Sequence, residues 1–175
     1  MSLLHIVTAP DERLSKISEP VTEINREIKK LVADMIETMR ADSGVGLAAV
    51  QVGTPLRIIV IDLAEDDDTE RPIGFYPLVM INPEITWESE EMCLAKEGCL
   101  SVPELRIEVP RPSEITVKFL DKNSKEHELD ADGWLARCIQ HEIDHLDGKI
   151  IIDYLSKLKK DLAISKLKKL KKQLL

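Results

Sequence analysis

The stretch QHEIDHLDG, residues 140–148, constrains this chain more than any other segment. It places His141 and His145 four residues apart, with Glu142 directly after the first histidine. On a helix, residues at this spacing share a face, so both imidazoles can hold one divalent metal ion with a carboxylate beside it. A catalytic site of this type commonly has three protein ligands and an open fourth position. The sequence therefore predicts a metal-binding helix and a third ligand elsewhere in the chain.

The helix that carries these histidines is predicted over residues 130–148, with Asp132 near its start and Gly148 just past its end. One helical stripe consists of Trp134, Cys138, His141 and His145. A different face carries Ile139, Ile143 and Leu146. The helix can therefore bury an apolar face while the histidine stripe lines a cleft. The alternative is a surface helix with scattered charges and histidines that are satisfied without a metal.

The third ligand has several candidates. The extended pattern with a further histidine six residues after His145 fails, because position 151 is isoleucine. No glutamate follows Glu142, so the downstream candidates are Asp153 and Asp161. The upstream candidates are His5, His127, Cys93, Cys99 and many carboxylates.

Cys99 is favoured by its setting in EGCLSVP, residues 97–103. Gly98 lets the backbone approach closely, and a thiolate suits a borderline or soft divalent ion. With the two histidines, Cys99 would make a three-ligand site with an open position. The alternative is a closed four-ligand site that includes Cys138, which would leave Glu142 without a purpose.

The remaining elements are predicted from periodicity. Residues 23–40 have helical spacing of apolar side chains, and the runs 57–63, 79–87 and 114–121 resemble strands. Residues 154–175 are predicted to form a second long helix whose apolar stripe shifts along its length. This order indicates an α+β fold, with mostly antiparallel strands packed around a central HExxH helix, an N-terminal helix and a long C-terminal helix. Aromatic residues are only 3% of the chain, so the core must rest on Ile, Leu, Val and Met.

Charge is unevenly distributed. The net charge is -8, but residues 154–175 hold eight Lys and one Asp, which leaves -15 for the remainder. A basic tail on an acidic body can attract nucleic acid through its positive charge, although a run of charged residues is more commonly a solvated face.

The odd count of three cysteines argues for a reducing compartment. The N-terminus lacks the pattern of a secretory signal, and no apolar run is long enough for a membrane span.

With GVGLAAVQVG, residues 44–53, the EGCLS and QHEIDHLDG stretches resemble the three signature motifs of the peptide deformylase family. The resemblance covers nearly the whole chain. It implies a hydrolase that removes the formyl group from the N-terminal formyl-methionine of nascent polypeptides and releases formate. It implies Cys99, His141 and His145 as metal ligands, with Fe²⁺ in the cell and Zn²⁺, Ni²⁺ or Co²⁺ as substitutes. Metal-bound water is then the nucleophile, and Glu142 is the general base and later the general acid.

The resemblance also assigns substrate contacts. The side chain of Gln51 and the backbone N–H of Leu100 hold the formyl oxygen. Backbone groups around Val45, Gly46 and Gly98 pair with the peptide, and Arg111 binds further along it. Trp134, Arg137 and Cys138 approach the site for the methionine side chain. The family often has an aliphatic residue where Arg137 stands, and we expect its stem to pack while its head reaches solvent.

The resemblance finally implies that two parts of the chain have separate functions. Residues 1–153 form the catalytic core, and the basic helix 154–175 docks on the ribosome near the nascent-chain exit. We expect a cytoplasmic monomer that binds no DNA and has no membrane span. Two rivals are a peptidase of the HExxH type with its third ligand at Asp153, and a non-catalytic ribosome-binding protein with a closed structural metal site.

Overall fold

The computed structural model describes residues 2–67 and 69–174; residues 1, 68 and 175, which belong to the predicted core and tail, lie outside this range. The strands form two sheets. The larger has the order β1 (Gly46–Ala48), β2 (Ile58–Ile61), β3 (Leu78–Glu88), β6 (Glu114–Leu120), β7 (Glu126–Asp132). The smaller pairs β4 (Met92–Cys99) with β5 (Val102–Pro112). Every ladder between these strands is antiparallel, so the predicted fold class is confirmed.

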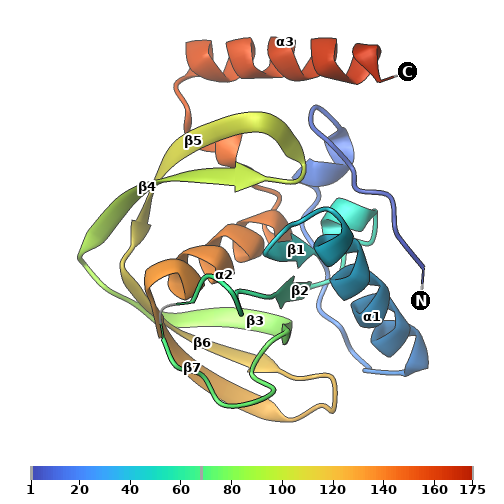
Figure 1. Ribbon diagram of the computed structural model, residues 1–175, viewed down its shortest axis with the longest axis vertical. Coiled ribbons are helices and arrows are strands. Elements are labelled where there is room, and N and C mark those ends of the chain that lie inside the picture. Colours follow the sequence, from blue (N-terminus) through green and yellow to red (C-terminus); the bar gives the residue numbers. More distant parts are fainter. Residues whose placement is uncertain (1, 68, 175) are drawn as a thin grey trace.

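The helices are α1 (Arg26–Ala41), α2 (Gly133–Leu146) and α3 (Lys157–Gln173). Short 3-10 turns form η1 (Glu12–Ser15), η2 (Ala49–Val52) and η3 (Ile151–Tyr154). Figure 1 shows α2 at the centre, with the large sheet on one side and the β4–β5 sheet on the other. Helix α2, which carries the two histidines, lies between the two sheets in this view, and α1 and α3 lie at the periphery.

Strand β2 is buried on both faces, which explains its uninterrupted apolar sequence IIVI. Its residues Ile59 and Ile61 share a core with the apolar face of α2, including Ile139 and Leu146. Its other face, with Ile58 and Val60, packs with the apolar stripe of α1. The largest fully buried side chains are all Leu, Ile or Met, as expected from the scarcity of aromatic residues.

The ends of α1 and α2 follow local chemistry. The side chain of Asn25 accepts a hydrogen bond from Ile28 N–H (3.0 Å), so α1 begins at residue 26 and not at the predicted 23. After α2, Gly148 has φ +76°, and a Cβ there would lie 2.6 Å from the backbone oxygen of Ser15. The glycine that follows the second histidine is therefore required both by the turn and by a close backbone approach.

The predicted start of α2 at residue 130 is wrong, because residues 126–132 form strand β7 against β6. No strand was predicted over the residues that form β1, β4 and β5. The predicted strands 57–63, 79–87 and 114–121 correspond to β2, β3 and β6.

Helix α3 begins after Ser156, whose hydroxyl accepts a hydrogen bond from Lys159 N–H. Among its described residues only Ala163 and Leu167 are buried, whereas Leu158 and Leu162 are exposed, so no single face of the helix is buried along its whole length, in keeping with the shift of its apolar stripe. The buried pair packs in a small core with residues of β5 and η3. Within the described part of the chain, no helix is long and apolar enough to cross a membrane.

Candidate metal centre

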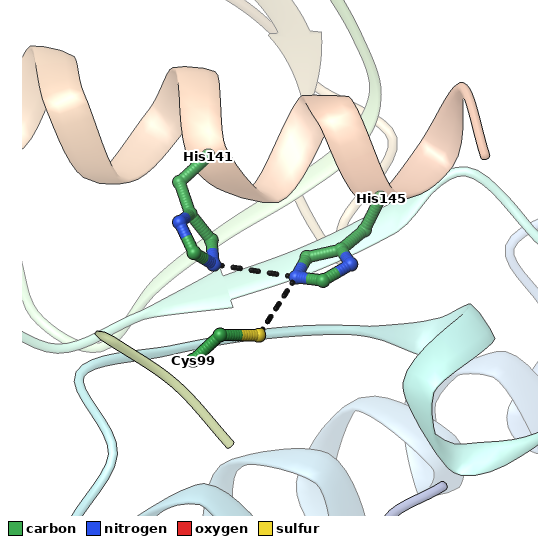
Figure 2. A group of neighbouring side chains, drawn as sticks. All are labelled: Cys99, His141 and His145. Atoms are coloured by element: carbon green, nitrogen blue, oxygen red, sulfur yellow. Dashed lines mark hydrogen bonds between the residues drawn. The ribbon is translucent and has the colours of Figure 1, made fainter. Parts of the chain in front are cut away.

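Cys99, His141 and His145 meet in space although they come from separate parts of the chain. His145 Nε2 lies 3.4 Å from Cys99 Sγ and 3.3 Å from His141 Nε2. All three candidate ligand atoms lie within 4.8 Å of one another. Figure 2 shows both imidazoles pointing from α2 toward the sulfur on β4. Such a set of one thiolate and two imidazoles is the donor chemistry that borderline divalent metals prefer.

The two elements that carry these ligands bring them together for simple geometric reasons. His141 and His145 are one helical turn apart and therefore share the face of α2 that points away from the large sheet. Cys99 is the last residue of β4, and the register of the β4–β5 ladder shifts between Glu97 and Cys99. The ligand set is thus split between a helix and the end of a hairpin strand.

The rival ligand sets are not assembled. In the described part of the chain, the only cluster of three or more potential metal-binding side chains is the one above, and it contains neither Cys138 nor Asp153. Asp153 instead accepts hydrogen bonds from Ile150 N–H (2.8 Å) and Lys160 Nζ (2.5 Å). Burial raises the pKa of the Cys138 thiol to about 12, and the case against Cys138 as a ligand is its position outside the cluster.

Glu97 orients the first histidine, and this role was missed in the sequence. His141 Nδ1 lies 2.8 Å from Glu97 Oε2, so this nitrogen donates to the carboxylate and Nε2 is left facing the cluster. Arg111 donates to both oxygens of Glu97, at 2.6 and 2.9 Å. Burial alone would raise the pKa of Glu97, but the bonds from Arg111 and His141 outweigh it and lower the pKa to about 2. Glu97 stands two residues before Cys99 in the same EGCLS motif, and this closeness in the sequence was the only signal for its role.

Glu142 lies beside the cluster on the next position of α2. Its carboxylate is 4.0 Å from His141 Nε2, and its Oε2 atom is buried without a hydrogen-bond partner. A Cβ at Gly46 would come within 3.0 Å of Glu142 Cδ, so a glycine is needed for β1 to pass this close. Burial raises the pKa of Glu142 to about 7. A carboxyl with this pKa can both accept and return a proton near neutral pH.

Gln51 is fixed at the other side of the cluster by bonds at both ends of its amide. Its Oε1 accepts from Ala48 N–H (2.8 Å), and its Nε2 donates to Ser101 Oγ (3.0 Å) and lies 3.7 Å from Cys99 Sγ. The side chain is almost fully buried. Because these bonds already fix the side chain, its amide donor is held next to Cys99, and a bound group would cause little further loss of side-chain entropy.

A cavity of about 810 Å³ opens onto these groups. It is lined by most of the residues predicted from the sequence: Val45, Gly46, Gln51, Gly98, Cys99, Leu100, Trp134, Arg137, Cys138, His141 and Glu142. Its rim adds charged residues that the sequence did not single out: Asp66, Lys96, Glu104 and Arg106. This volume lies within the range usual for small-molecule sites.

Arg111 is not a cavity residue, and the expectation that it contacts a bound peptide is wrong. It is only 3% exposed, and its guanidinium is bound to Glu97 and, at 2.9 Å, to Asp144. The exposed arginine on β5 that lines the cavity is Arg106.

The expectation for Arg137 is also wrong. Its head does not reach solvent: the residue is 6% exposed, and its guanidinium lies against Glu97 at 2.7 Å. The buried Glu97 carboxylate on strand β4 overrides the usual tendency of arginine to place its charge in water.

Comparisons with known proteins agree with one another. The family model described as polypeptide deformylase matches residues 3–161. Peptide deformylase 1 of Rickettsia conorii is 56% identical over 171 residues, which is 98% of each chain. The crystal structure of a peptide deformylase from Ehrlichia chaffeensis in complex with actinonin is 52% identical, with a TM-score of 0.89 over 97% of this chain and 98% of that one. A peptide deformylase from Legionella pneumophila is 42% identical, with a TM-score of 0.88 over 99% and 98% of the two chains.

Proposed function

Because this chain belongs to the polypeptide deformylase family, whose members are enzymes, we propose that it removes the formyl group from formyl-methionine at the N-terminus of nascent polypeptides and releases formate. The observation that carries the proposal is the convergence of Cys99, His141 and His145 at the wall of a cavity, beside the buried carboxylate of Glu142, whose Oε2 has no hydrogen-bond partner. The direct test is formate release from a formyl-Met tripeptide.

The three ligands fit a divalent ion. The bond from His141 Nδ1 to Glu97 selects the tautomer that offers Nε2. Burial lowers the pKa of His145 and keeps its imidazole neutral, which is the form that binds metals. A bound ion supplies an activated water at neutral pH and polarises a carbonyl oxygen. We take Fe²⁺ to be the ion in the cell, as in the family, and the same donors also accept Zn²⁺, Ni²⁺ or Co²⁺.

Glu142 moves the protons of the reaction. Its carboxylate accepts the proton of the attacking water and passes it to the amine that leaves when the C–N bond of the formamide breaks. The unpaired Oε2 and the pKa of about 7 suit both transfers. Gln51 Nε2 and the backbone N–H of Leu100 are the proposed donors to the formyl oxygen as negative charge develops on it.

The cavity walls provide the substrate contacts. In this proposal, backbone groups around Val45, Gly46 and Gly98 pair with an extended peptide, and the position of all three residues in the cavity lining supports this role. The methionine side chain lies against Trp134 and Cys138 in this proposal. Arg106 replaces Arg111 as the residue that meets the peptide further along.

Replacing Trp134 with alanine is expected to weaken selection for formyl-Met over other formylated residues. The indole is half exposed at the cavity wall and supplies apolar area to a bound side chain. We expect the ratio of kcat/KM for formyl-Met against formyl-Ala tripeptides to fall by about tenfold, since a pocket contact of this size is worth about 1–3 kcal/mol. Trp87→Ala is the matched control, because Trp87 is equally exposed but lies outside the cavity. An unchanged ratio in Trp134→Ala would remove Trp134 from the methionine pocket.

We further propose that α3 is the ribosome-binding part of the chain, separate from the catalytic core of residues 1–153. Its exposed lysines include Lys159, Lys166, Lys168, Lys169 and Lys172, and positive charge on an acidic body favours ribosomal RNA. A monomeric state and a cytoplasmic location remain predictions.

Reversing the charge of Lys166, Lys168 and Lys169 to glutamate is expected to weaken ribosome binding at least about tenfold, with a loss that shrinks as salt rises. Truncation of the helix is a poorer test, because it removes Leu167 from the core. The matched control reverses Lys29, Lys122 and Lys125, which are exposed elsewhere. Cosedimentation with ribosomes measures binding, and activity on short peptides should stay unchanged. Equal binding by both triple variants would contradict the assignment.

A further inference from the structure

The guanidinium of Arg137 makes three hydrogen bonds that the proposed reaction does not use. Its Nη1 donates to Glu97 Oε1 (2.7 Å) and to the backbone oxygen of Val109 (2.9 Å). Its Nη2 donates to the backbone oxygen of Cys93 (2.7 Å). The group is nearly fully buried, so each bond is formed away from competing water.

These acceptors lie on the two strands of one hairpin. Cys93 and Glu97 belong to β4, and Val109 belongs to β5. Among the described residues, β4 and β5 pair only with each other and share no ladder with the five-stranded sheet. The position of the hairpin relative to α2 therefore depends on side-chain contacts, and Arg137 supplies a contact to each strand from one planar group.

The metal ligands are divided between the same two parts. Cys99 ends β4, whereas His141 and His145 lie on α2. Arg137 is one helical turn before His141, and the Glu97 carboxylate that it contacts also accepts from His141 Nδ1. Arg137 thus touches the strand of the cysteine ligand and the orienting partner of a histidine ligand at once.

We infer that Arg137 is a positioning residue that holds strand β4 against helix α2, so that Cys99 and the two histidines stay at metal-binding distance. This role rests on the proposed metal centre. It differs from that of Arg111, which lies on β5 itself and whose hydrogen bonds go to the side chains of Glu97, Asp144 and Tyr154 and to no backbone oxygen of the hairpin. Loss of Arg137 leaves the backbone oxygens of Cys93 and Val109 without this donor and lets the hairpin end shift.

The test compares Arg137→Met and Arg137→Lys with Gln140→Leu in the full chain loaded with Co²⁺. Gln140 is the matched control: its Nε2 donates to Pro112 O (3.0 Å), a partly buried bond from α2 to the same hairpin that does not involve Glu97. Three readouts are taken: the rate of Co²⁺ loss to excess chelator, the visible thiolate-to-cobalt absorption, and the melting temperature.

Arg137→Met is expected to lose Co²⁺ at least about tenfold faster than the parent, because partners of ligands typically contribute about 10–100-fold to metal affinity. Its thiolate-to-cobalt band should weaken or shift. Arg137→Lys should be intermediate, since a point charge can stay near Glu97 but cannot reach all three acceptors. Gln140→Leu should lower the melting temperature with the rate of Co²⁺ loss and the spectrum unchanged.

A parent-like rate of Co²⁺ loss and spectrum in Arg137→Met would overturn the inference, whatever its melting temperature. Should Arg137→Met fail to fold, Arg137→Lys decides, and parent-like metal loss in that variant would overturn it equally. A parent protein that binds no Co²⁺ would refute the metal centre itself, and that result is seen before any variant is made.

Discussion

Glu142→Gln should lower kcat/KM for formate release by about 10²–10⁴-fold while the protein keeps its metal. Glutamine preserves the shape of the side chain in its tight contact with Gly46 but cannot accept a proton. The carboxylate is not among the three clustered ligand atoms, so metal binding should survive. Formate release from a formyl-Met tripeptide and metal content per chain measure the two effects separately.

The same substitution distinguishes the catalytic proposal from a structural metal site. In a closed, non-catalytic site Glu142 has no reaction to serve, and the parent itself would release no formate. A variant that keeps more than about a tenth of the parental rate would show that another group moves the proton. The melting temperature is the control for folding, and it should not fall, because the buried Oε2 has no hydrogen bond to lose.

Cys99→Ala should abolish formate release through loss of the metal. Among the residues that the structure describes, Cys99 is one of three clustered ligands, and its removal leaves two histidines, which are too few protein ligands for a stable catalytic site. We expect affinity for Zn²⁺ or Co²⁺ to fall by more than about 100-fold, since even the partners of ligands contribute about 10–100-fold. Competition with a chelator of known affinity measures this loss.

The controls for Cys99→Ala are the other two cysteines. Cys93→Ser changes an exposed thiol, and Cys138→Ser changes a cavity thiol outside the ligand cluster. Both should retain the metal. If Cys99→Ala retained the metal, a third ligand elsewhere would be supported, such as Asp153 in the peptidase rival. If Cys138→Ser lost the metal, the closed four-ligand site would be supported.

The local parts of this site were predictable because helical geometry fixes them. The spacing of His141, Glu142 and His145 determines their directions once α2 forms, and the apolar residues on its other face guarantee that it forms against a sheet. Cys99 was favoured by its setting in EGCLSVP, by the metal preference of a thiolate and by the family resemblance. The preceding glutamate, Glu97, was visible in the same motif, but its bond to His141 depends on how β4 meets α2.

The errors come from strands whose pairing the sequence does not reveal. Arg106 and Arg111 lie on one strand at an odd separation, so their side chains take opposite faces, and only the register decides which of them meets the cavity. The side chain of Arg137 is buried because its acceptors come from residues at least 28 positions away in the chain. No local sequence pattern indicates acceptors so far away in the chain, and hydrophobic periodicity alone predicts that Arg137 lies on the surface.

The measurement that tests the proposed function most directly is product analysis with the parent protein, purified without oxygen and loaded with Fe²⁺. A formyl-Met tripeptide is the substrate, and formate, free amine and shorter peptides are all quantified. We predict stoichiometric formate and free methionyl tripeptide with no cleavage of the peptide bonds. Folded, metal-loaded protein that releases no formate, or that cuts the peptide bonds instead, would contradict the assignment of a deformylase.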